Sequence, residues 1–346
     1  MIEYLLNAPR NMALRNTGRL KPMQIMYAVT DRCNSRCTTC NIWSSQPKLE
    51  LLTPEEVRNI FSQSLFSNVR FIINSGGEPS TRSDLNELFY AEHDALPKAK
   101  LQVSTNALLP DKIISLVKSC QERDICVEVG TSLDGVGGKH DESRGVPGNF
   151  EKVDYLIRKL DGRCAVGFVL TEETAPNLRE LRSYLKTEFN IEPLVQWYNE
   201  ARFYSNTAEP TDNGTVLGIL EGLPASPTNE LWIKHEQGKA TRFPCYTLNT
   251  FFALKCNGEV VPCLKLWDMS IGNLRDLPAD AVWTGTAANR ARHTVKNCRG
   301  CFNAWGVEWS YCATMYQFLW FYTRHPDILL QYRINLLKDK FKSRKV

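Results

Sequence analysis

Short apolar runs rich in β-branched residues alternate with longer amphipathic stretches from Lys21 to Asn213. The short runs predict strands, and the stretches between them, with apolar residues three or four positions apart, predict helices. The predicted strands cover residues 24–30, 69–76, 100–106, 126–134, 164–171 and 193–199. Repeated strand and helix units form parallel sheets. The pattern therefore predicts an α/β fold, a partial (β/α)6 barrel of the TIM type.

Two of the predicted helices carry further signals. Thr53 and Glu56, three positions apart, form a capping box at the start of residues 53–66. Residues 149–160 place apolar side chains at helical spacing, at Phe150, Val153, Ile157 and Leu160. Both helices therefore have a face that can pack on a sheet.

The pattern changes after the last predicted strand. Residues 209–238 are rich in Pro, Gly, Thr and Asn, which predicts a linker that contains one helix. Residues 251–263 predict a hairpin that turns at Asn257 and Gly258. Residues 314–345 predict a helix interrupted at His325 and Pro326.

These signals predict five parts of the chain. They are an N-terminal extension, a barrel core, a linker, a small cysteine-bearing unit (a hairpin plus a helix) and a C-terminal basic helix, at residues 1–20, 21–215, 216–240, 241–315 and 316–346.

Composition and charge narrow the function classes. The 346 residues are 43% hydrophobic and 23% charged, which excludes a disordered chain. The formal net charge of +4 combines basic ends with an acidic body, since residues 1–22 carry +3, residues 324–346 carry +5 and the remainder carries −4. A nucleic-acid-binding protein needs a basic face on its body. We therefore expect no nucleic-acid partner.

The first residues and the cysteine content indicate the compartment. The segment MIEYLLNAPR lacks the features of a signal peptide, and no apolar run approaches the roughly 20 residues of a membrane helix. A cytoplasmic location is therefore expected. Since the cytosol is reducing, the 12 cysteines are expected to be metal ligands or redox groups where they cluster, and not disulfides.

Three cysteines lie close together directly after the first predicted strand. Cys33, Cys37 and Cys40 have the spacing C-x3-C-x2-C. Three thiolates can hold three irons of a 4Fe-4S cluster and leave the fourth iron open to an exchangeable ligand. Structural zinc takes four ligands, usually as C-x2-C pairs. The triplet therefore favours an iron-sulfur cluster, with zinc as the alternative.

A glycine-rich turn follows the second predicted strand, at residues 75–79 (SGGEP). Gly76 and Gly77 let backbone groups come close to a ligand, and Glu78 can accept hydrogen bonds from an ammonium group. Alone, the turn also fits an ordinary strand-to-helix connection. Together, C-x3-C-x2-C after the first strand and GGEP after the second resemble the radical S-adenosylmethionine (SAM) enzymes over residues 21–215.

This resemblance implies a set of cofactors and ligands. A 4Fe-4S cluster on the three cysteines binds the amino and carboxylate groups of SAM, and an electron from the cluster releases a 5′-deoxyadenosyl radical that takes a hydrogen atom from the substrate. The implied SAM-binding residues are Gly76, Gly77, Glu78, Pro79, Ser104, Asn106, Ser132 and Arg144.

Within that set the resemblance gives individual roles. It places Glu78 at the amino group, Ser104 and Asn106 at the ribose, and Ser132 and Arg144 at the carboxylate. The two serines also fit simple caps of strand ends. One position departs from the family, because the usual aromatic residue before the third cysteine is Thr39. The adenine contact is therefore expected elsewhere, at Ile42 or Trp43.

A second group of cysteines lies around the predicted hairpin and beyond it, at Cys245, Cys256, Cys263, Cys298, Cys301 and Cys312. A hairpin pair followed by C-x2-C also builds zinc ribbons. The spacing resembles the twitch domain, a shortened SPASM domain with one auxiliary 4Fe-4S cluster. The resemblance implies four ligands, Cys245, Cys263, Cys298 and Cys301.

The other cysteines and the histidines are given different roles. Cys256 and Cys312 are candidate catalytic hydrogen-atom donors, or else small buried side chains. Cys120, Cys126 and Cys164 are expected in the core. The histidines show no metal-ligand spacing and are expected on the surface or in loops, at His93, His140, His235, His293 and His325.

The predicted activity is dehydrogenation or epimerisation of a carbinol carbon in a sugar or aminocyclitol. The predicted partners are this small-molecule substrate and an electron donor of the flavodoxin or ferredoxin type. A peptide (RiPP) maturase is one alternative, and a non-catalytic zinc-bearing module is another.

Two further segments bear on substrate and partners. Residues near the last predicted strand are expected around the substrate cavity, namely Trp197, Tyr198, Glu200, Arg202, Phe203 and Tyr204. The aromatic residues 315–322 and the basic tail 338–345 predict weak contact with an anionic membrane surface.

Overall fold

A computed structural model of the chain describes residues 8–44, 49–198, 201–206, 213–239, 244–298, 306–307, 310 and 315–328. The predicted parallel sheet is confirmed. Neighbouring strands from β1 to β6 are all parallel, in the order in which they follow along the chain. Their bounds are Gln24–Thr30 (β1), Phe71–Gly76 (β2), Lys100–Ser104 (β3), Val127–Ser132 (β4), Ala165–Leu170 (β5) and Leu194–Trp197 (β6).

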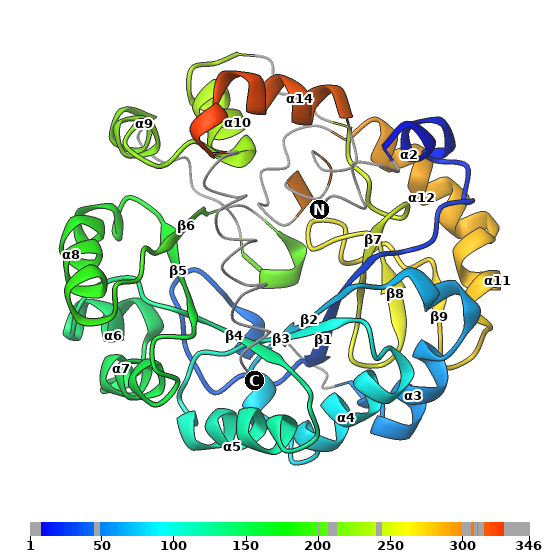
Figure 1. The fold of residues 1–346 in the computed structure, drawn as a ribbon, viewed down its shortest axis with the longest axis horizontal. Helices are drawn as coiled ribbons and strands as arrows, with labels where there is room; N and C mark the ends of the chain where they lie inside the picture. Colours follow the sequence, from blue (N-terminus) through cyan, green and yellow to red (C-terminus); the bar gives the residue numbers. More distant parts are fainter. Residues whose placement is uncertain are drawn as a thin grey trace.

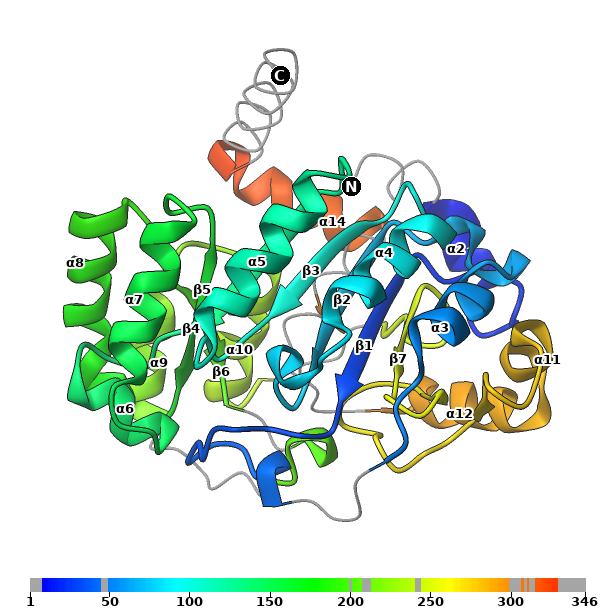
Figure 2. The ribbon, with the colours of Figure 1, turned by 90° about the horizontal axis from the view of Figure 1, so that it is seen from below.

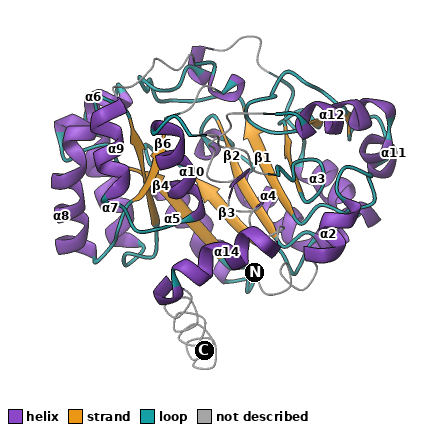
Figure 3. Ribbon diagram, turned by 90° about the horizontal axis from the view of Figure 1, so that it is seen from above, coloured by secondary structure: helices purple, strands orange, loops and turns teal. Residues whose placement is uncertain are grey.

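Helices between these strands cover the outer side of the sheet, as an arc in Figure 1 and as the purple layer beside the orange strands in Figure 3. They are α3 (Pro54–Phe61), α4 (Leu85–Ala95), α5 (Pro110–Gln121), α6 (Gly138–Arg144), α7 (Asn149–Lys159) and α8 (Leu178–Phe189). The predicted capping box is present in α3, where Glu56 N–H donates to Thr53 Oγ1 at 3.2 Å and Thr53 N–H donates to the Glu56 carboxylate at 2.7 Å.

Side chains along each strand alternate between the face covered by helices and the face that lines the inside of the barrel. On β3, Leu101 and Val103 are fully buried beneath the helices, whereas Gln102 and Ser104 point to the other face and are half-buried. Successive side chains of a strand point to opposite faces. The outer face therefore forms the hydrophobic core, and the inner face carries the polar groups of a cavity. This architecture is the partial barrel that the sequence predicts.

The predicted hairpin is part of the same sheet. Strand β7 (Phe251–Leu254) pairs in parallel with β1, with Gln24 opposite Phe251 and Tyr27 opposite Leu254. The antiparallel strands β8 (Glu259–Val261) and β9 (Gly272–Asn273) extend the sheet to nine strands. The cysteine-bearing hairpin is thus hydrogen-bonded to the strand that leads into the first cysteine triplet.

Two helices follow the hairpin, and two more form in the segment predicted to be a linker. α11 (Ala279–Thr284) and α12 (Thr286–Lys296) follow the hairpin. The prediction of a single helix in the linker is wrong, because α9 (Asn213–Glu221) and α10 (Pro227–Glu236) both form there. Val216, Leu220 and Trp232 are buried in the core. Local composition predicts a linker here, but these apolar side chains are enough to anchor two short helices.

The two terminal helices are α2 (Ala8–Leu14) and α14 (Met315–Arg324). In Figure 2, α14 lies at the upper edge of the molecule, whereas the blue segment that follows β1 lies at the lower edge. Glu230 of α10 holds the end of α14 through Arg324 at 2.6 Å and His325 at 2.9 Å. None of the described helices has the length and apolar character needed to span a bilayer. The basic tail from residue 338 onward lies outside the described residues.

Candidate functional site

A cavity of about 430 Å³ lies inside the barrel and reaches the carboxyl ends of the strands. Active sites of β/α barrels are found at this end. Both groups of cysteines line the cavity, through Cys33, Cys37, Cys40, Cys245, Cys263 and Cys298. One space therefore joins the two predicted cluster sites. Cys301, the fourth predicted ligand of the second site, lies outside the described residues.

The loop that carries the first three cysteines is held at several points by backbone hydrogen bonds. Arg36 N–H donates to the carbonyl of Arg144 at 3.0 Å, and Asn41 N–H donates to the carbonyl of Tyr204 at 2.8 Å. Gly145 is required beside it, since it has a φ of +62° and a Cβ there would lie 2.5 Å from the Arg36 carbonyl oxygen. The loop is therefore positioned by α6 and by the turn after β6.

The glycine-rich turn after β2 also packs on this loop. Gly76 has a φ of +122°, and a Cβ on Gly77 would lie 2.1 Å from the carbonyl oxygen of Arg32. Gly77 N–H donates to the Thr30 carbonyl at 2.8 Å, and Glu78 N–H donates to the Arg32 carbonyl at 2.7 Å. Gly76 thus permits a close approach to Thr30 at the end of β1, and Gly77 permits one to the cysteine-bearing loop.

Glu78 is almost fully buried, with 1% of its surface exposed. Its Oε1 accepts hydrogen bonds from Ser80 N–H at 3.1 Å, Ser80 Oγ at 2.6 Å and Thr105 Oγ1 at 2.7 Å. Its Oε2 accepts a hydrogen bond from Asn106 N–H at 2.7 Å. Burial raises the pKa of Glu78, and these hydrogen bonds act against that rise. The carboxylate ties β2 to β3 and keeps one acceptor position on Oε2.

Arg144 lines the cavity and is paired with a buried carboxylate. Its Nε lies 2.8 Å from Asp134 Oδ2, and its Nη1 lies 3.8 Å from Cys37 Sγ. Burial acts to lower the pKa of Arg144, but the charge of Asp134 holds it above its usual value. Nη2 is buried with no hydrogen-bond partner in the described part of the chain. Asp134 thus holds the guanidinium of Arg144 beside the cavity, where a guanidinium is suited to binding a carboxylate.

Most of the other predicted SAM-binding residues line the same cavity, namely Gly76, Gly77, Glu78, Ser104, Asn106 and Ser132. Pro79 differs, because it is buried in a short 3-10 helix (Pro79–Thr81) and is not among the described lining residues. Thr39 and Ile42 line the cavity. The ring of Trp43 instead lies under the guanidinium of Arg36, whose Cζ is 4.8 Å from the centroid of that ring. Of the two residues expected at the adenine, Ile42 therefore lines the cavity, and Trp43 is not among the described lining residues.

The structure bears differently on the two cysteines predicted as hydrogen-atom donors. Cys256 is 2% exposed, and burial raises the pKa of its thiol to about 12. It is not among the described residues that line the cavity. Cys312 lies outside the described residues. The structure therefore gives no support for Cys256 as a donor, and the role of Cys312 stays a prediction.

Several other predictions can be compared with the structure. Cys120 and Cys164 are buried as predicted, but Cys126 is exposed, so its predicted core position is wrong. His140 is 1% exposed, so its predicted surface position is also wrong. Tyr198, Phe203 and Tyr204 line the cavity as expected, whereas Arg202 is exposed and lies 3.7 Å from Asp268. Glu200 and the side chain of Trp197 are not described.

Some cavity residues were not predicted from the sequence. Gln102, Gln196, Trp232 and Lys265 all line it. The two glutamines precede Ser104 and Tyr198 by two positions, so the period of a strand would place them on the inner face. Trp232 and Lys265 come from segments whose place in the fold is set by long-range packing.

The described residues give no grouping suited to a single metal ion. No three Cys, His, Asp or Glu side chains among them converge as ligands of one ion do.

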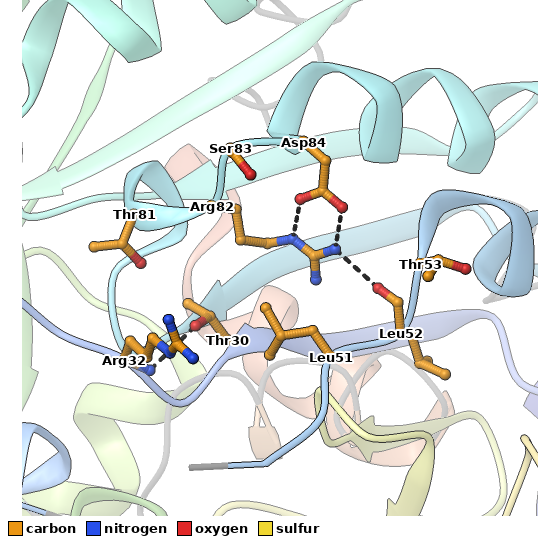
Figure 4. A pocket seen from close by; sticks show the side chains of 9 residues that line it. All are labelled: Thr30, Arg32, Leu51, Leu52, Thr53, Thr81, Arg82, Ser83 and Asp84. Atoms are coloured by element: carbon orange, nitrogen blue, oxygen red, sulfur yellow. Dashed lines mark hydrogen bonds and ion pairs between the residues drawn. The ribbon is translucent and has the colours of Figure 1, made fainter.

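A smaller cavity of about 250 Å³ lies on the other side of the cysteine-bearing loop, and Figure 4 shows its lining. Arg82 is its buried charge, and its guanidinium binds both carboxylate oxygens of Asp84, at 2.8 and 2.7 Å, and the carbonyl of Leu52 at 2.8 Å. The donors of Arg82 are thus used within the chain. This cavity is a structural junction between loops.

Comparison with sequence families gives two matches. The profile of the Radical SAM superfamily matches residues 27–181. The profile of the SPASM iron-sulfur cluster-binding domain matches residues 245–302.

Relatives of characterised function include three that align over most of the chain. An AdoMet-dependent heme synthase of Methanosarcina barkeri is 30% identical over 320 residues, which is 84% of this chain and 88% of the relative. A GTP 3′,8-cyclase of Sulfurimonas denitrificans is 38% identical over 82% of this chain and 92% of its own. The subtilosin biosynthesis protein AlbA of Bacillus subtilis is 28% identical over 81% of this chain and 67% of its own.

Solved structures share the fold at lower identity. SuiB of Streptococcus suis bound to S-adenosylmethionine superposes with a TM-score of 0.64 at 17% identity, over 84% of this chain and 72% of SuiB. anSMEcpe with bound AdoMet superposes with a TM-score of 0.59 at 19% identity, over 91% of this chain and 100% of the other. Two SAM-bound proteins therefore have the same architecture.

Proposed function

The chain belongs to the radical SAM superfamily, and on that premise we propose that it oxidises or inverts a hydroxyl-bearing carbon of a small polar metabolite, a sugar or an aminocyclitol. Its cofactors are SAM, the 4Fe-4S cluster that binds SAM, and an auxiliary 4Fe-4S cluster. When bound, they supply a 5′-deoxyadenosyl radical that takes a hydrogen atom from the substrate. Membership in this family replaces the alternative of a zinc-bearing module.

In this proposal each cysteine group has one role. Cys33, Cys37 and Cys40 hold the SAM-binding cluster, because they lie on one loop that the backbone of β2 and α6 fixes in place. Cys245, Cys263 and Cys298, with Cys301, hold the auxiliary cluster on the opposite part of the cavity lining. A reduced flavodoxin or ferredoxin supplies the electron.

The SAM ligands follow from free hydrogen-bonding capacity at the cavity. Arg144 Nη2 has no partner among the described residues and would bind the carboxylate of SAM. The remaining acceptor position of Glu78 Oε2 would bind the ammonium group. Ser104, Asn106 and Ser132 would hold the ribose and the carboxylate from the ends of β3 and β4.

The chemical character of the lining carries the proposal for the substrate. Among the described lining residues the charged side chains are Glu78, Arg144 and Lys265, and the first two are assigned to SAM. The inner face of the barrel offers neutral amide and hydroxyl groups, such as those of Gln102 and Gln196. Such groups suit a hydroxyl-rich molecule. A nucleoside triphosphate or a porphyrin with several carboxylates would need more cations than the described part of the lining provides beside Arg144 and Lys265.

The two versions of the reaction need different groups. In oxidation, loss of the hydrogen atom from carbon leaves a substrate radical, which becomes a carbonyl by losing the hydroxyl proton and one electron. The cysteines of the auxiliary site lie on the same cavity and would hold the electron acceptor. In inversion, the radical regains a hydrogen atom on its other face from an S–H bond. The thiyl radical left on sulfur returns to the thiol by taking one electron from the electron donor and one proton from solvent. Cys312 is the remaining candidate for that thiol.

A peptide substrate is the second candidate, because two peptide-related proteins resemble this chain. AlbA is named for biosynthesis of the bacteriocin subtilosin, and SuiB has been solved with its precursor peptide SuiA. In this case one peptide side chain would enter the cavity in place of the metabolite.

Formation of 5′-deoxyadenosine distinguishes these candidates. The anaerobically reconstituted chain is incubated with SAM, dithionite and separate panels of aminocyclitols, nucleotide sugars and cysteine-containing peptides. We expect a hydroxylated metabolite to raise 5′-deoxyadenosine formation above the rate without substrate. In deuterated water, solvent deuterium at one inverted carbon indicates epimerisation, and a carbonyl product without it indicates oxidation.

Two variants control this experiment. Cys37→Ala removes a proposed cluster ligand and should abolish SAM cleavage, whereas Cys126→Ala changes an exposed cysteine outside the cavity lining and should preserve it. Stimulation by the peptides alone would replace the metabolite proposal with the peptide one. No reductive cleavage of SAM by a chain with a full complement of iron would contradict both.

A further inference from the structure

A chain of buried hydrogen bonds runs through a histidine that has no place in the mechanism described so far. Asp134 N–H donates to His140 Nδ1 at 3.1 Å. A backbone N–H can only donate, so Nδ1 accepts, and Nε2 carries the proton that is shared with Asn149 Oδ1 at 3.2 Å. Asn149 Nδ2 then donates to the carbonyl of Asn106 at 2.9 Å. The chain therefore connects the end of β4 to the end of β3.

Both ends of this chain lead to proposed SAM ligands. At one end, the carboxylate of Asp134 pairs with Arg144 Nε at 2.8 Å and accepts a hydrogen bond from Ser143 Oγ at 2.9 Å. At the other end, Asn106 itself lines the cavity. His140 and Arg144 lie one helical turn apart in α6. A displacement of His140 would therefore move the backbone that carries Arg144.

The residues that form this chain of hydrogen bonds are buried, and the histidine among them is uncharged at neutral pH. Asp134 and His140 are each 1% exposed, and Asn149 is fully buried. Burial, assisted by the positive charge of Arg144, lowers the pKa of His140 to about 4. The imidazole is therefore neutral at neutral pH, and its two nitrogens keep distinct roles as acceptor and donor.

The helix that carries these residues has little to fix its orientation by itself. α6 has seven residues, and Gly137 and Gly145 flank it at φ values of +59° and +62°. A helix this short is marginal without tertiary contacts. His140 is its buried residue. The position of α6 thus depends on what its side chains hold.

We propose that His140 is a positioning residue, which through Asn149 fixes Arg144 relative to Asn106 across the SAM site. The inference rests on the SAM ligands assigned under the proposed function. It predicts that SAM affinity depends on two side chains, His140 and Asn149, neither of which lines the cavity in the described part of the chain.

Two substitutions cut the chain at different bonds. His140→Asn keeps an acceptor near the position of Nδ1 and removes the donor to Asn149. Asn149→Asp keeps an acceptor for His140 and removes the donor to the Asn106 carbonyl. His93→Asn, at a half-buried position on α4, is the matched control. The probe is SAM, and its Kd is measured from the change in the electron paramagnetic resonance spectrum of the reduced cluster.

We expect each single variant to raise the Kd for SAM about tenfold, with unchanged iron content, because one buried hydrogen bond in a positioning chain is lost. The Kd of the double variant for SAM should not exceed the higher of the two single-variant values, since both substitutions interrupt the same chain of hydrogen bonds. His93→Asn should leave the Kd unchanged. A purely structural role would instead lower the melting temperature of both variants and leave the Kd of the folded protein as in the wild type.

Two further variants separate this inference from the ligand assignment. Ser132→Ala and Arg144→Gln change proposed SAM ligands directly and should weaken SAM binding. If these weaken binding and the His140 and Asn149 variants do not, the positioning role is overturned and the ligand assignment stands. If none of the four changes the Kd, the ligand assignment is wrong and the inference falls with it. Independent, multiplicative effects at His140 and Asn149 would also overturn it.

Discussion

Substitution of Gly77 by alanine tests how the first cluster site is built. A Cβ at this position would lie 2.1 Å from the carbonyl oxygen of Arg32, and real Cβ contacts stay beyond 3.0 Å, so the two backbones must separate by about an ångström. That movement breaks two hydrogen bonds, from Gly77 N–H to Thr30 and from Glu78 N–H to Arg32.

The expected loss of stability follows from these bonds. Each buried backbone bond that is left unmade costs about 1–2 kcal/mol. Alanine also restricts the unfolded chain, which offsets the loss by up to about 1 kcal/mol. Gly77→Ala should therefore lower the free energy of unfolding by about 1–4 kcal/mol. Because the displaced segment leads into Cys33, iron content after reconstitution should fall as well.

The measurements are urea unfolding and iron and sulfide analysis of the reconstituted chain. Gly138→Ala is the matched control, because a Cβ there meets nothing within 4 Å. It lies in a helix, where alanine stabilises by up to about 1 kcal/mol relative to glycine. The two variants should therefore change stability in opposite directions. Wild-type stability and iron content in Gly77→Ala would refute the reasoning.

Three further predictions concern other parts of the chain. Cys298→Ser should lose the iron of the auxiliary cluster but keep reductive cleavage of SAM, as measured by iron analysis and 5′-deoxyadenosine formation; equal loss of both would contradict separate sites. Wild type should lose about 1.4 kcal/mol of stability per pH unit relative to His140→Asn as the pH falls from about 6.5 to about 4, because the unfolded histidine binds a proton that the buried one excludes. Burial raises the pKa of Glu92 to about 8, so stability should depend on pH in the opposite direction at this residue. Glu92→Gln should gain stability relative to wild type as the pH rises from about 4.5 to about 8, and urea midpoints that stay parallel over this range would disprove it.

The sequence was informative where chemistry and local pattern coincide. Every strand from β1 to β6 lies within its predicted range, because runs such as residues 24–30 are apolar, β-branched and bounded by turn residues. Cys33, Cys37 and Cys40 lie within eight residues of one another, so one loop brings them together. Ser104 and Ser132, which the resemblance to radical SAM enzymes implies as SAM contacts, both line the cavity because parallel strands end at one edge of a sheet.

Other features depend on contacts that no local pattern contains. The burial of His140 follows from its bonds to Asp134 and Asn149, whereas its sequence neighbours Lys139 and Asp141 are charged. The partners of Gly76 and Gly77 lie more than forty residues away, so the glycines indicate a close approach but not what approaches.

The parallel pairing of β7 with β1 has a consequence for electron transfer. Electron tunnelling between redox centres depends steeply on distance. Here Cys33 follows the carboxyl end of β1, whereas Cys245 precedes β7 and Cys263 follows the antiparallel strand β8, so the proposed auxiliary centre lies toward the amino end of the paired strands β1 and β7. The distance between the two proposed centres therefore depends on this strand pair, and the segment between β6 and β7 can change in length without changing the pairing.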